Sequence, residues 1–138
     1  MDLVPYLNFN GTCAEAFKFY EKALGGKIVT TMTFGETPAK DHVPANWQGK
    51  VMHVALQAGG RWLYGSDGMA SDYKAPAGMS VALDPGTVVE GQRIFDALSQ
   101  GGTVTMKFEK TFWSPGFGSL VDRFGIPWMI NVAADERR

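Results

Sequence analysis

The chain carries one pattern twice, first as FKFYEKALGGKI at residues 17–28 and again, in outline, as QRIFDALSQGGTV at residues 92–104. In each copy an amphipathic helix runs into a Gly-Gly pair and then into a β-branched strand. Glycine ends a helix because it adopts the left-handed C-terminal conformation without steric cost. The repeat therefore predicts two modules of the same order, each beginning with a strand and a helix.

The first module is predicted to be βαβββ. Its helix is expected at residues 13–24, with Asn10 or Thr12 as the cap. Helical spacing gives this helix an apolar face made by Ala16, Phe19, Tyr20, Ala23 and Leu24. The strands are expected at residues 3–9, 27–34, 50–57 and 61–66. Residues 35–49 form a long loop that contains proline and could act as a lid.

The second module repeats that order. Its strands are predicted at residues 79–83, 103–108, 117–123 and 126–132, and its helix at residues 88–100. The helix is expected to turn Val89, Ile94, Phe95 and Leu98 inward, and Trp128 is expected in the core. The 138 residues are interpreted as a single domain: module one at 1–66, a linker at 67–77, module two at 78–133 and a polar tail at 134–138.

The composition excludes several partners. With 45% hydrophobic residues the chain can form a core without disulfides, and the lone Cys13 favours a reducing, cytoplasmic location. The N-terminus lacks a signal-peptide pattern and no apolar run is long enough to span a bilayer, so no membrane partner is expected. The 13 basic and 14 acidic residues form no basic cluster outside Arg137-Arg138, so no nucleic-acid partner is expected and a small molecule is favoured.

Short motifs in a fixed order connect the chain to a known family. They are Pro5–Gly11, Ala16–Tyr20, Gly25-Gly26, Met52-His53-Val54, Gly65-Ser66-Asp67, Thr111-Phe112-Trp113, Phe117-Gly118, Asp122–Gly125 and Trp128–Asn131. With these motifs the chain resembles the PhnB-like branch of the vicinal oxygen chelate superfamily, also labelled a 3-demethylubiquinone-9 3-methyltransferase-like domain. The resemblance implies an α+β glyoxalase/bleomycin-resistance/dioxygenase-like fold, in which two βαβββ modules form a curved eight-stranded mixed sheet with a cleft. It also implies a homodimer.

Metal-using members of that superfamily hold the ion with His and Glu side chains from the first and last strands of each module. The matching positions here are Val4 or Pro5, Tyr64 or Gly65, Met79 or Ser80, and Met129. None of them supplies the imidazole or carboxylate that zinc or nickel needs. A shift by one residue brings in only the neutral oxygens of Tyr6, Ser66 and Asn131. We therefore expect no metal and no other cofactor, with an atypical divalent-metal site as the remaining alternative.

His53 is the candidate catalytic residue, because strand alternation puts it on the face opposite Val54, where it could act as a general base. No carboxylate partner for it is visible. His42, beside Asp41, is interpreted as a solvated loop residue. A helix N-terminus could lower the pKa of the Cys13 thiol, but a small buried residue is the favoured interpretation. The chain has no nucleophile elbow and no phosphate-binding glycine pattern, and methyl transfer is not inferred.

Aromatic and small polar side chains supply the candidate ligand-binding site. Those expected to line the cleft are Tyr6, Asn8, Tyr64, Ser66, Ser80 and Asn131, with Trp113 at the rim. Because aromatic rings stack on flat or apolar molecules, the leading hypothesis is a metal-free cleft that binds a small, partly aromatic or apolar ligand. One alternative is a lyase, isomerase or oxygenase-type enzyme that uses His53 or an atypical metal site. Another is a dimeric interaction module.

Overall fold

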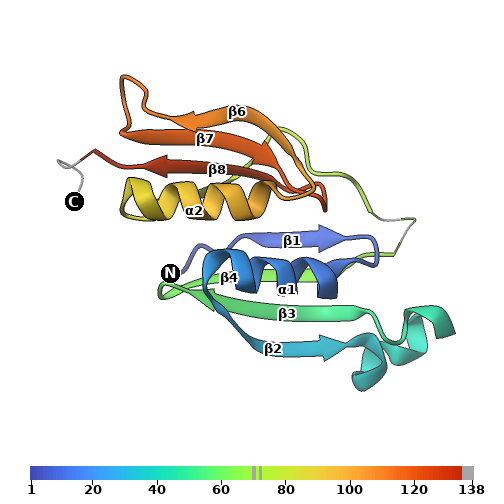
Figure 1. The fold of residues 1–138 in the computed structure, drawn as a ribbon. Helices are drawn as coiled ribbons and strands as arrows, with labels where there is room; N and C mark the ends of the chain where they lie inside the picture. Colours follow the sequence, from blue (N-terminus) through green and yellow to red (C-terminus); the bar gives the residue numbers. More distant parts are fainter. Residues whose placement is uncertain (70, 72, 135–138) are drawn as a thin grey trace. The chain divides into compact units, whose positions relative to one another are not determined.

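The computed structural model describes residues 1–69, 71 and 73–134 (Figure 1). The chain is divided into two units, Met1–Lys74 and Ala75–Arg138, and the described residues of each form one four-stranded sheet and one α-helix. Neither α-helix is long and apolar enough to cross a bilayer.

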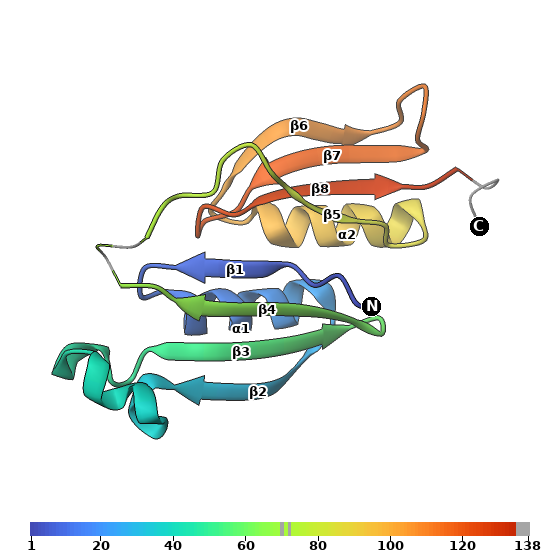
Figure 2. The ribbon, with the colours of Figure 1, turned by 180° about the vertical axis from the view of Figure 1, so that it is seen from behind.

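The first unit has the order βαβββ. Its elements are β1 (Tyr6–Phe9), α1 (Cys13–Leu24), β2 (Lys27–Thr33), the 3-10 helices η1 (Phe34–Glu36), η2 (Pro38–His42) and η3 (Ala45–Trp47), β3 (Val51–Ala58) and β4 (Arg61–Asp67). The strand order across the sheet is β1-β4-β3-β2, with β1 parallel to β4 and the other pairs antiparallel. Parallel strands need a long connection. Here that connection contains α1, which covers one face of the sheet (Figure 2).

The second unit has the same order. Its elements are β5 (Val81–Leu83), α2 (Val88–Ser99), β6 (Thr103–Glu109), β7 (Gly116–Val121) and β8 (Pro127–Val132). The strands lie in the order β5-β8-β7-β6, again with one parallel pair, β5 with β8. The predicted α+β architecture of two βαβββ modules is confirmed. Among the described residues, hydrogen bonds join the strands into two four-stranded sheets and not into one eight-stranded sheet. β1 and β5 are each an edge strand of their own sheet.

The core of the first unit is built by one stripe of α1. The buried side chains of this helix are Cys13, Ala16, Phe17, Tyr20 and Ala23. Phe17 is fully buried and lies over β4 at Gly65, where a Cβ atom would come within 2.4 Å of Phe17 Cε1. The prediction that Phe19 faces inward is wrong. The buried residues of α1 follow one another at spacings of three and four and include Phe17, so Phe19 lies beside this stripe and is half-exposed.

The core of the second unit follows the prediction with one exception. Ile94 and Leu98 of α2 are buried, and Trp128 is 1% exposed. The prediction for Val89 is wrong, since its side chain is 82% exposed. Gly91 takes the buried place on the first turns of α2, where a Cβ atom would lie 2.9 Å from Phe108 Cζ. A residue without a side chain allows the helix to lie close to the sheet.

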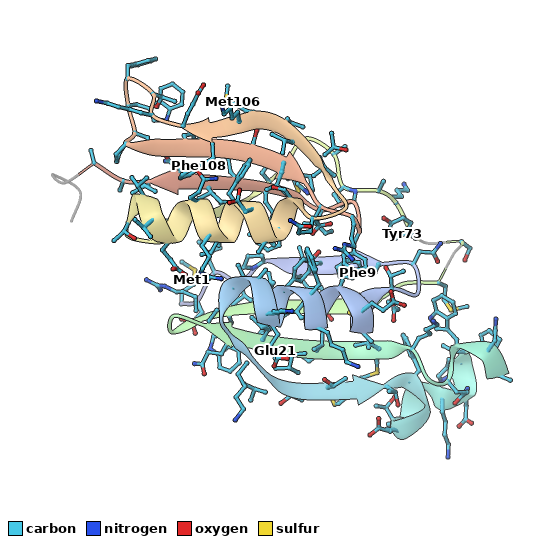
Figure 3. All side chains as sticks on the ribbon, in the orientation of Figure 1. Met1, Phe9, Glu21, Tyr73, Met106 and Phe108 are labelled. Carbon is cyan, nitrogen blue, oxygen red and sulfur yellow. The ribbon has the colours of Figure 1, made fainter. Side chains whose placement is uncertain are left out.

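Each unit has an aromatic side chain that marks its interior. Phe9 at the end of β1 is 1% exposed, and Phe108 near the end of β6 is 6% exposed (Figure 3). Both residues lie on the face of their sheet that packs against the helix. In the part of each unit that the structure describes, no α-helix of that unit covers the opposite face of the sheet, so this is the face on which a site can form.

The two helices begin in different ways. Thr87 caps α2, because its Oγ1 accepts a hydrogen bond from the Glu90 backbone N–H at 3.1 Å. Thr12 is the N-cap residue of α1, but its side chain makes no capping hydrogen bond. The carboxylate of Asp67 does this instead, since Oδ1 accepts from the backbone N–H groups of Gly11 and Cys13 at 2.9 and 3.0 Å. The cap of α1 therefore comes from the end of β4.

Candidate functional site

The open face of the first sheet is the face opposite α1, and it carries Tyr6, Asn8, His53, Tyr64 and Ser66. Strand alternation puts these side chains on one side and the buried core on the other. The parallel register of β1 and β4 sets Tyr6 beside Tyr64 and Asn8 beside Ser66. The fold therefore brings together five of the eight residues that the sequence proposes for the site.

Three rings gather on this face. The centroids of Tyr6 and His53 are 5.8 Å apart, those of His53 and Tyr64 are 5.1 Å apart, and those of Tyr6 and Tyr64 are 6.3 Å apart. The two contacts of Tyr64 are edge-on, the geometry that aromatic quadrupoles favour. Trp62 continues the group along β4, with its ring 6.1 Å from that of Tyr64. The result is an aromatic surface contributed by β1, β3 and β4.

His53 has a partner that the sequence does not reveal. The hydroxyl of Tyr6 lies 3.2 Å from His53 Nδ1, although 47 residues separate the two in the chain. A phenol that donates to Nδ1 leaves the proton of the neutral ring on Nε2. His53 then presents an N–H donor at Nε2. The alternation of β1 indicates which face Tyr6 lies on, but only the pairing of β1 with β4 sets its distance from His53.

A small polar pair continues the same face. Ser66 Oγ donates to Asn8 Oδ1 at 3.4 Å. Tyr6, Asn8, Tyr64 and Ser66 carry no formal charge, and His53 is an imidazole. On β2 the basic Lys27 pairs with Gln57, which alternates onto the same face as His53.

The open face of the second sheet is the face opposite α2. Asn131 on β8 pairs with Phe117 on β7, and the Asn131 Oδ1 atom is buried without a hydrogen-bond partner. Trp113, 46% exposed, has its ring 5.3 Å from that of Phe117. Ser80 is not in β5, which starts one residue later, and it is exposed. The expected strand at residues 79–83 is therefore shorter at its start.

A rigid turn presents Trp113. The buried Ser114 Oγ lies 2.8 Å from the Gly116 carbonyl oxygen and 2.7 Å from that of Val132. Thr111 Oγ1 accepts from the Ser114 N–H at 3.1 Å, which closes the turn. Phe112, at its tip, is 97% exposed and contacts Trp113 edge-on at 4.8 Å. These hydrogen bonds fix the aromatic loop before anything binds to it.

The donor set of the two open faces does not fit a divalent metal ion. Within residues 1–69, 71 and 73–134, no three His, Cys, Asp or Glu side chains come together. Asp67 and Asp122 are buried carboxylates at the ends of strands, but their oxygens accept hydrogen bonds from backbone N–H groups. His53 is bonded to Tyr6 through Nδ1. Phenol, amide and hydroxyl oxygens are poor ligands for zinc or nickel.

Cys13 is not poised as a nucleophile. Its side chain is fully buried, and burial raises the pKa of the thiol, with a further upward contribution from the Asp67 carboxylate. These effects outweigh the helix N-terminus, which would lower the pKa. The favoured interpretation of a small buried residue is confirmed. His42 and Asp41 are exposed in η2.

Known proteins are similar to this chain along nearly its whole length. A family model described as 3-demethylubiquinone-9 3-methyltransferase matches residues 1–131. Protein YjdN of Escherichia coli (strain K12) is 35% identical over 144 residues, covering 99% of this chain and 98% of that protein. The crystal structure of protein PA1353 from Pseudomonas aeruginosa is 40% identical with a TM-score of 0.88, covering 98% of this chain and 99% of that one. The PhnB protein from Bacillus cereus, 24% identical over 96% of this chain and 100% of its own, has the same fold at a TM-score of 0.80.

Proposed function

The chain belongs to the family described as 3-demethylubiquinone-9 3-methyltransferase, the PhnB-like branch of the vicinal oxygen chelate superfamily, and from this we propose that it binds a small, uncharged aromatic or apolar molecule without a metal ion. The binding surface is the open face of the first sheet. The observation that carries the proposal is the ring cluster of Tyr6, His53 and Tyr64.

The ring cluster supplies the apolar part of recognition. Tyr6 is 46% exposed, and Tyr64 and His53 are half-exposed, so their rings have surface left for a ligand. Burying a flat molecule against such rings is favourable by about 25 cal/mol for each Å² of apolar surface removed from water. The contacts among the rings hold them in place before binding, so little side-chain entropy is lost.

The polar part of recognition comes from hydrogen-bond donors. His53 offers Nε2–H when Tyr6 occupies Nδ1, and the ring of Tyr64, which carries a hydroxyl group, lies 5.1 Å from the His53 ring. A carbonyl oxygen on the ligand has two lone pairs and can accept a hydrogen bond from each of these donors. We therefore favour aromatic ketones and related carbonyl compounds over acids or amines.

Methyl transfer, which the family description names, is not part of the proposal. It would need a site for an adenosyl cofactor, which doubly wound methyltransferases build on a glycine-rich turn between a strand and a helix. In this chain the turn before α1 contains one glycine, Gly11. The N–H groups of Gly11 and Cys13 are already bonded to Asp67. The helix N-terminus thus holds a carboxylate of its own chain.

A titration with acetophenone tests the proposal, because this ketone is aromatic, uncharged and free of hydrogen-bond donors. We expect it to shift the amide NMR signals of β1, β3 and β4, and Tyr64→Ala to weaken binding by about tenfold. Tyr73→Ala, which removes a tyrosine outside the strands, is the matched control and leaves the affinity unchanged. Equal affinity in the Tyr64→Ala variant and the wild type contradicts the site.

A second candidate function is an enzyme in which His53 is the acid or base. The hydrogen bond from Tyr6 favours it, because a tyrosine at Nδ1 orients the ring and leaves Nε2 for a substrate. In that case His53→Gln keeps the binding of acetophenone but abolishes turnover of any carbonyl substrate found for the wild type. Retained turnover in this variant eliminates the mechanism. The dimeric interaction module, the homodimer and the cytoplasmic location stay predictions.

A further inference from the structure

We propose that the second unit has its own binding position for an uncharged aromatic molecule that carries an O–H or N–H donor, such as a phenol. The carbonyl oxygen of Asn131 accepts the donor, and Phe117 and Trp113 contact the ring. This position goes beyond the proposed function, which concerns the first sheet and a ligand with an acceptor.

Asn131 is an unusual residue for its place in the fold. It lies on β8, where buried side chains alternate with half-buried ones, and it is one of the half-buried ones, between Ile130 at 0% and Val132 at 3% exposure. Asparagine is depleted in strands, and its neighbours pack against α2 while its own side chain lies on the open face. Packing alone does not account for an amide at this position.

The oxygen of this amide lacks a partner. Asn131 Oδ1 is buried and has no hydrogen bond, whereas almost all buried polar atoms in proteins have one. Ser119, the neighbouring polar side chain on β7, already shares a hydrogen bond of 2.7 Å with Thr105. Asn131 Oδ1 is therefore an acceptor held out of water; when the amide turns toward the open face, a donor on a ligand would satisfy it.

Aromatic rings stand next to that acceptor. Phe117 is the direct cross-strand partner of Asn131, so their side chains lie on the same face. The ring of Phe117 meets Trp113 at an interplanar angle of 66°. Because Ser114 and Thr111 fix the turn that carries Trp113, this aromatic wall is formed in advance.

The charges around the position favour a neutral ligand. Met129 and Ser119 flank Asn131 and Phe117 on the open face, and neither is charged. On β6, Glu109 is the cross-strand partner of Phe117 and is exposed, and Lys107, two residues before it, is exposed and has the opposite charge. A phenol combines the three required properties: a ring, a donor and no charge at neutral pH.

The experiment compares phenol with anisole, which has the same ring but a methyl group in place of the donor. Both are titrated into the full chain, and the side-chain N–H signals of Asn131 and Trp113 are followed by NMR. We expect both signals to shift with phenol, and phenol to bind at least about tenfold more tightly than anisole. Equal affinities, or no shift of these signals with phenol, overturn the proposal.

Two variants identify the acceptor. Asn131→Leu keeps a similar volume and removes the oxygen, so it should abolish the preference for phenol over anisole. Asn46→Leu changes an exposed asparagine in η3 and should keep the preference. A preference retained in Asn131→Leu overturns the proposal. Leucine removes the buried oxygen, so if this oxygen has no partner the Asn131→Leu variant should be at least as stable as the wild type. A less stable variant contradicts the unpartnered oxygen as well.

The same titrations separate this position from the site on the first sheet. Tyr64→Ala should weaken the binding of acetophenone but leave the ratio of the phenol affinity to the anisole affinity unchanged. Asn131→Leu should leave the binding of acetophenone unchanged and abolish the preference for phenol over anisole. If Tyr64→Ala abolishes phenol binding, phenol binds to the first sheet and the inference for Asn131 is wrong, while the proposed function stands.

Discussion

Asp67 and Cys13 lie in contact although 54 residues separate them, and the Cys13 backbone N–H donates to Asp67 Oδ1 at 3.0 Å. The same oxygen accepts from Gly11, and Oδ2 accepts from Val51 at 2.9 Å. One carboxylate thus ties the end of β4 to the start of α1 and the start of β3. Asp67 is 2% exposed, so these hydrogen bonds are shielded from water.

Asp122 performs a related task in the second unit. Its Oδ1 accepts from the N–H groups of Phe124 and Ile126, and its Oδ2 accepts from Trp128 Nε1 at 2.8 Å. Both aspartates belong to short motifs of the family resemblance, Gly65-Ser66-Asp67 and Asp122–Gly125. These motifs have a structural role, because they organise turns at the ends of strands.

Replacing Asp67 should lower stability. Asp67→Asn puts an amide N–H₂ where one oxygen accepted a hydrogen bond, so a buried backbone donor loses its partner, and we expect the free energy of unfolding to fall by about 2 to 4 kcal/mol. Urea unfolding measures the change. Asp41→Asn, in the exposed η2, is the control and should change stability by less than about 0.5 kcal/mol. Equal effects of the two substitutions contradict the role of Asp67.

The stability of the protein should fall at alkaline pH through Cys13. Burial, and then Asp67, raise the pKa of this thiol above its ordinary value of 9.0. Above that pH the unfolded chain releases a proton that the folded chain keeps. The stability that Cys13 contributes is therefore fully present below pH 9.0 and declines above it by about 1.4 kcal/mol per pH unit.

Urea unfolding at about pH 8 and about pH 10 tests this slope. Cys13→Ala has no thiol, so its stability should fall less between the two pH values, whatever its starting stability. The same slope in the variant and the wild type would show that other groups cause the loss.

Gly65 should not tolerate a side chain. A Cβ atom there would lie 2.4 Å from Phe17 Cε1 and 2.8 Å from Cζ, in a core that has no room for it. We expect Gly65→Ala to lower the free energy of unfolding by about 1 to 3 kcal/mol. Gly49→Ala is the matched control, since no atom lies within 4 Å of the added Cβ. Chemical denaturation of both variants gives the comparison, and a neutral Gly65→Ala contradicts the packing of α1 on β4.

The hydrogen bond between Tyr6 and His53 should set the tautomer of the imidazole. In the wild type we expect the neutral ring to carry its proton on Nε2, because Nδ1 lies 3.2 Å from the Tyr6 hydroxyl and can accept its proton in a hydrogen bond. Nitrogen-15 NMR of the ring nitrogens reports the tautomer. Tyr6→Phe removes the donor, and the preference should weaken, while the exposed His42 is unchanged in both proteins. A proton on Nδ1 in the wild type contradicts the arrangement.

Metal content gives a further test of the open faces. Because the candidate site residues on these faces offer phenol, amide and hydroxyl oxygens and a single imidazole, we expect less than about 0.1 mole of zinc, nickel, manganese or iron per chain after purification without chelator. Elemental mass spectrometry measures this, before and after incubation with the divalent ions. A content near one mole per chain would restore metal-assisted chemistry as the leading function.

Local patterns predicted the helices well. The helix α1 occupies Cys13–Leu24 as predicted, because its stop signal, Gly25, lies in the chain itself and adopts a left-handed conformation with φ of 67°. The strand β5 is less predictable, since only Val81–Leu83 find partners on β8. A strand ends where its neighbour ends, and the neighbour is distant in sequence.

For the candidate site, alternation in β1, β3 and β4 indicated which side chains share a face. It did not indicate that Tyr6 bonds to His53, or that Asn131 Oδ1 is buried without a partner. Both depend on which strands lie next to one another. The same is true of Phe17, which takes the inward position expected for Phe19 because Gly65 leaves space for it.

By itself, the sequence determined the repeat, the order βαβββ, the helix ends and the face on which each strand residue lies, because these follow from periods of two and 3.6 residues and from local glycine stops. Only the tertiary structure decided that Asp67 caps α1, that Gly91 and not Val89 faces the sheet, and that Tyr6 reaches His53. These are contacts between residues far apart in the chain, and they depend on the pairing register and the packing distance of whole elements.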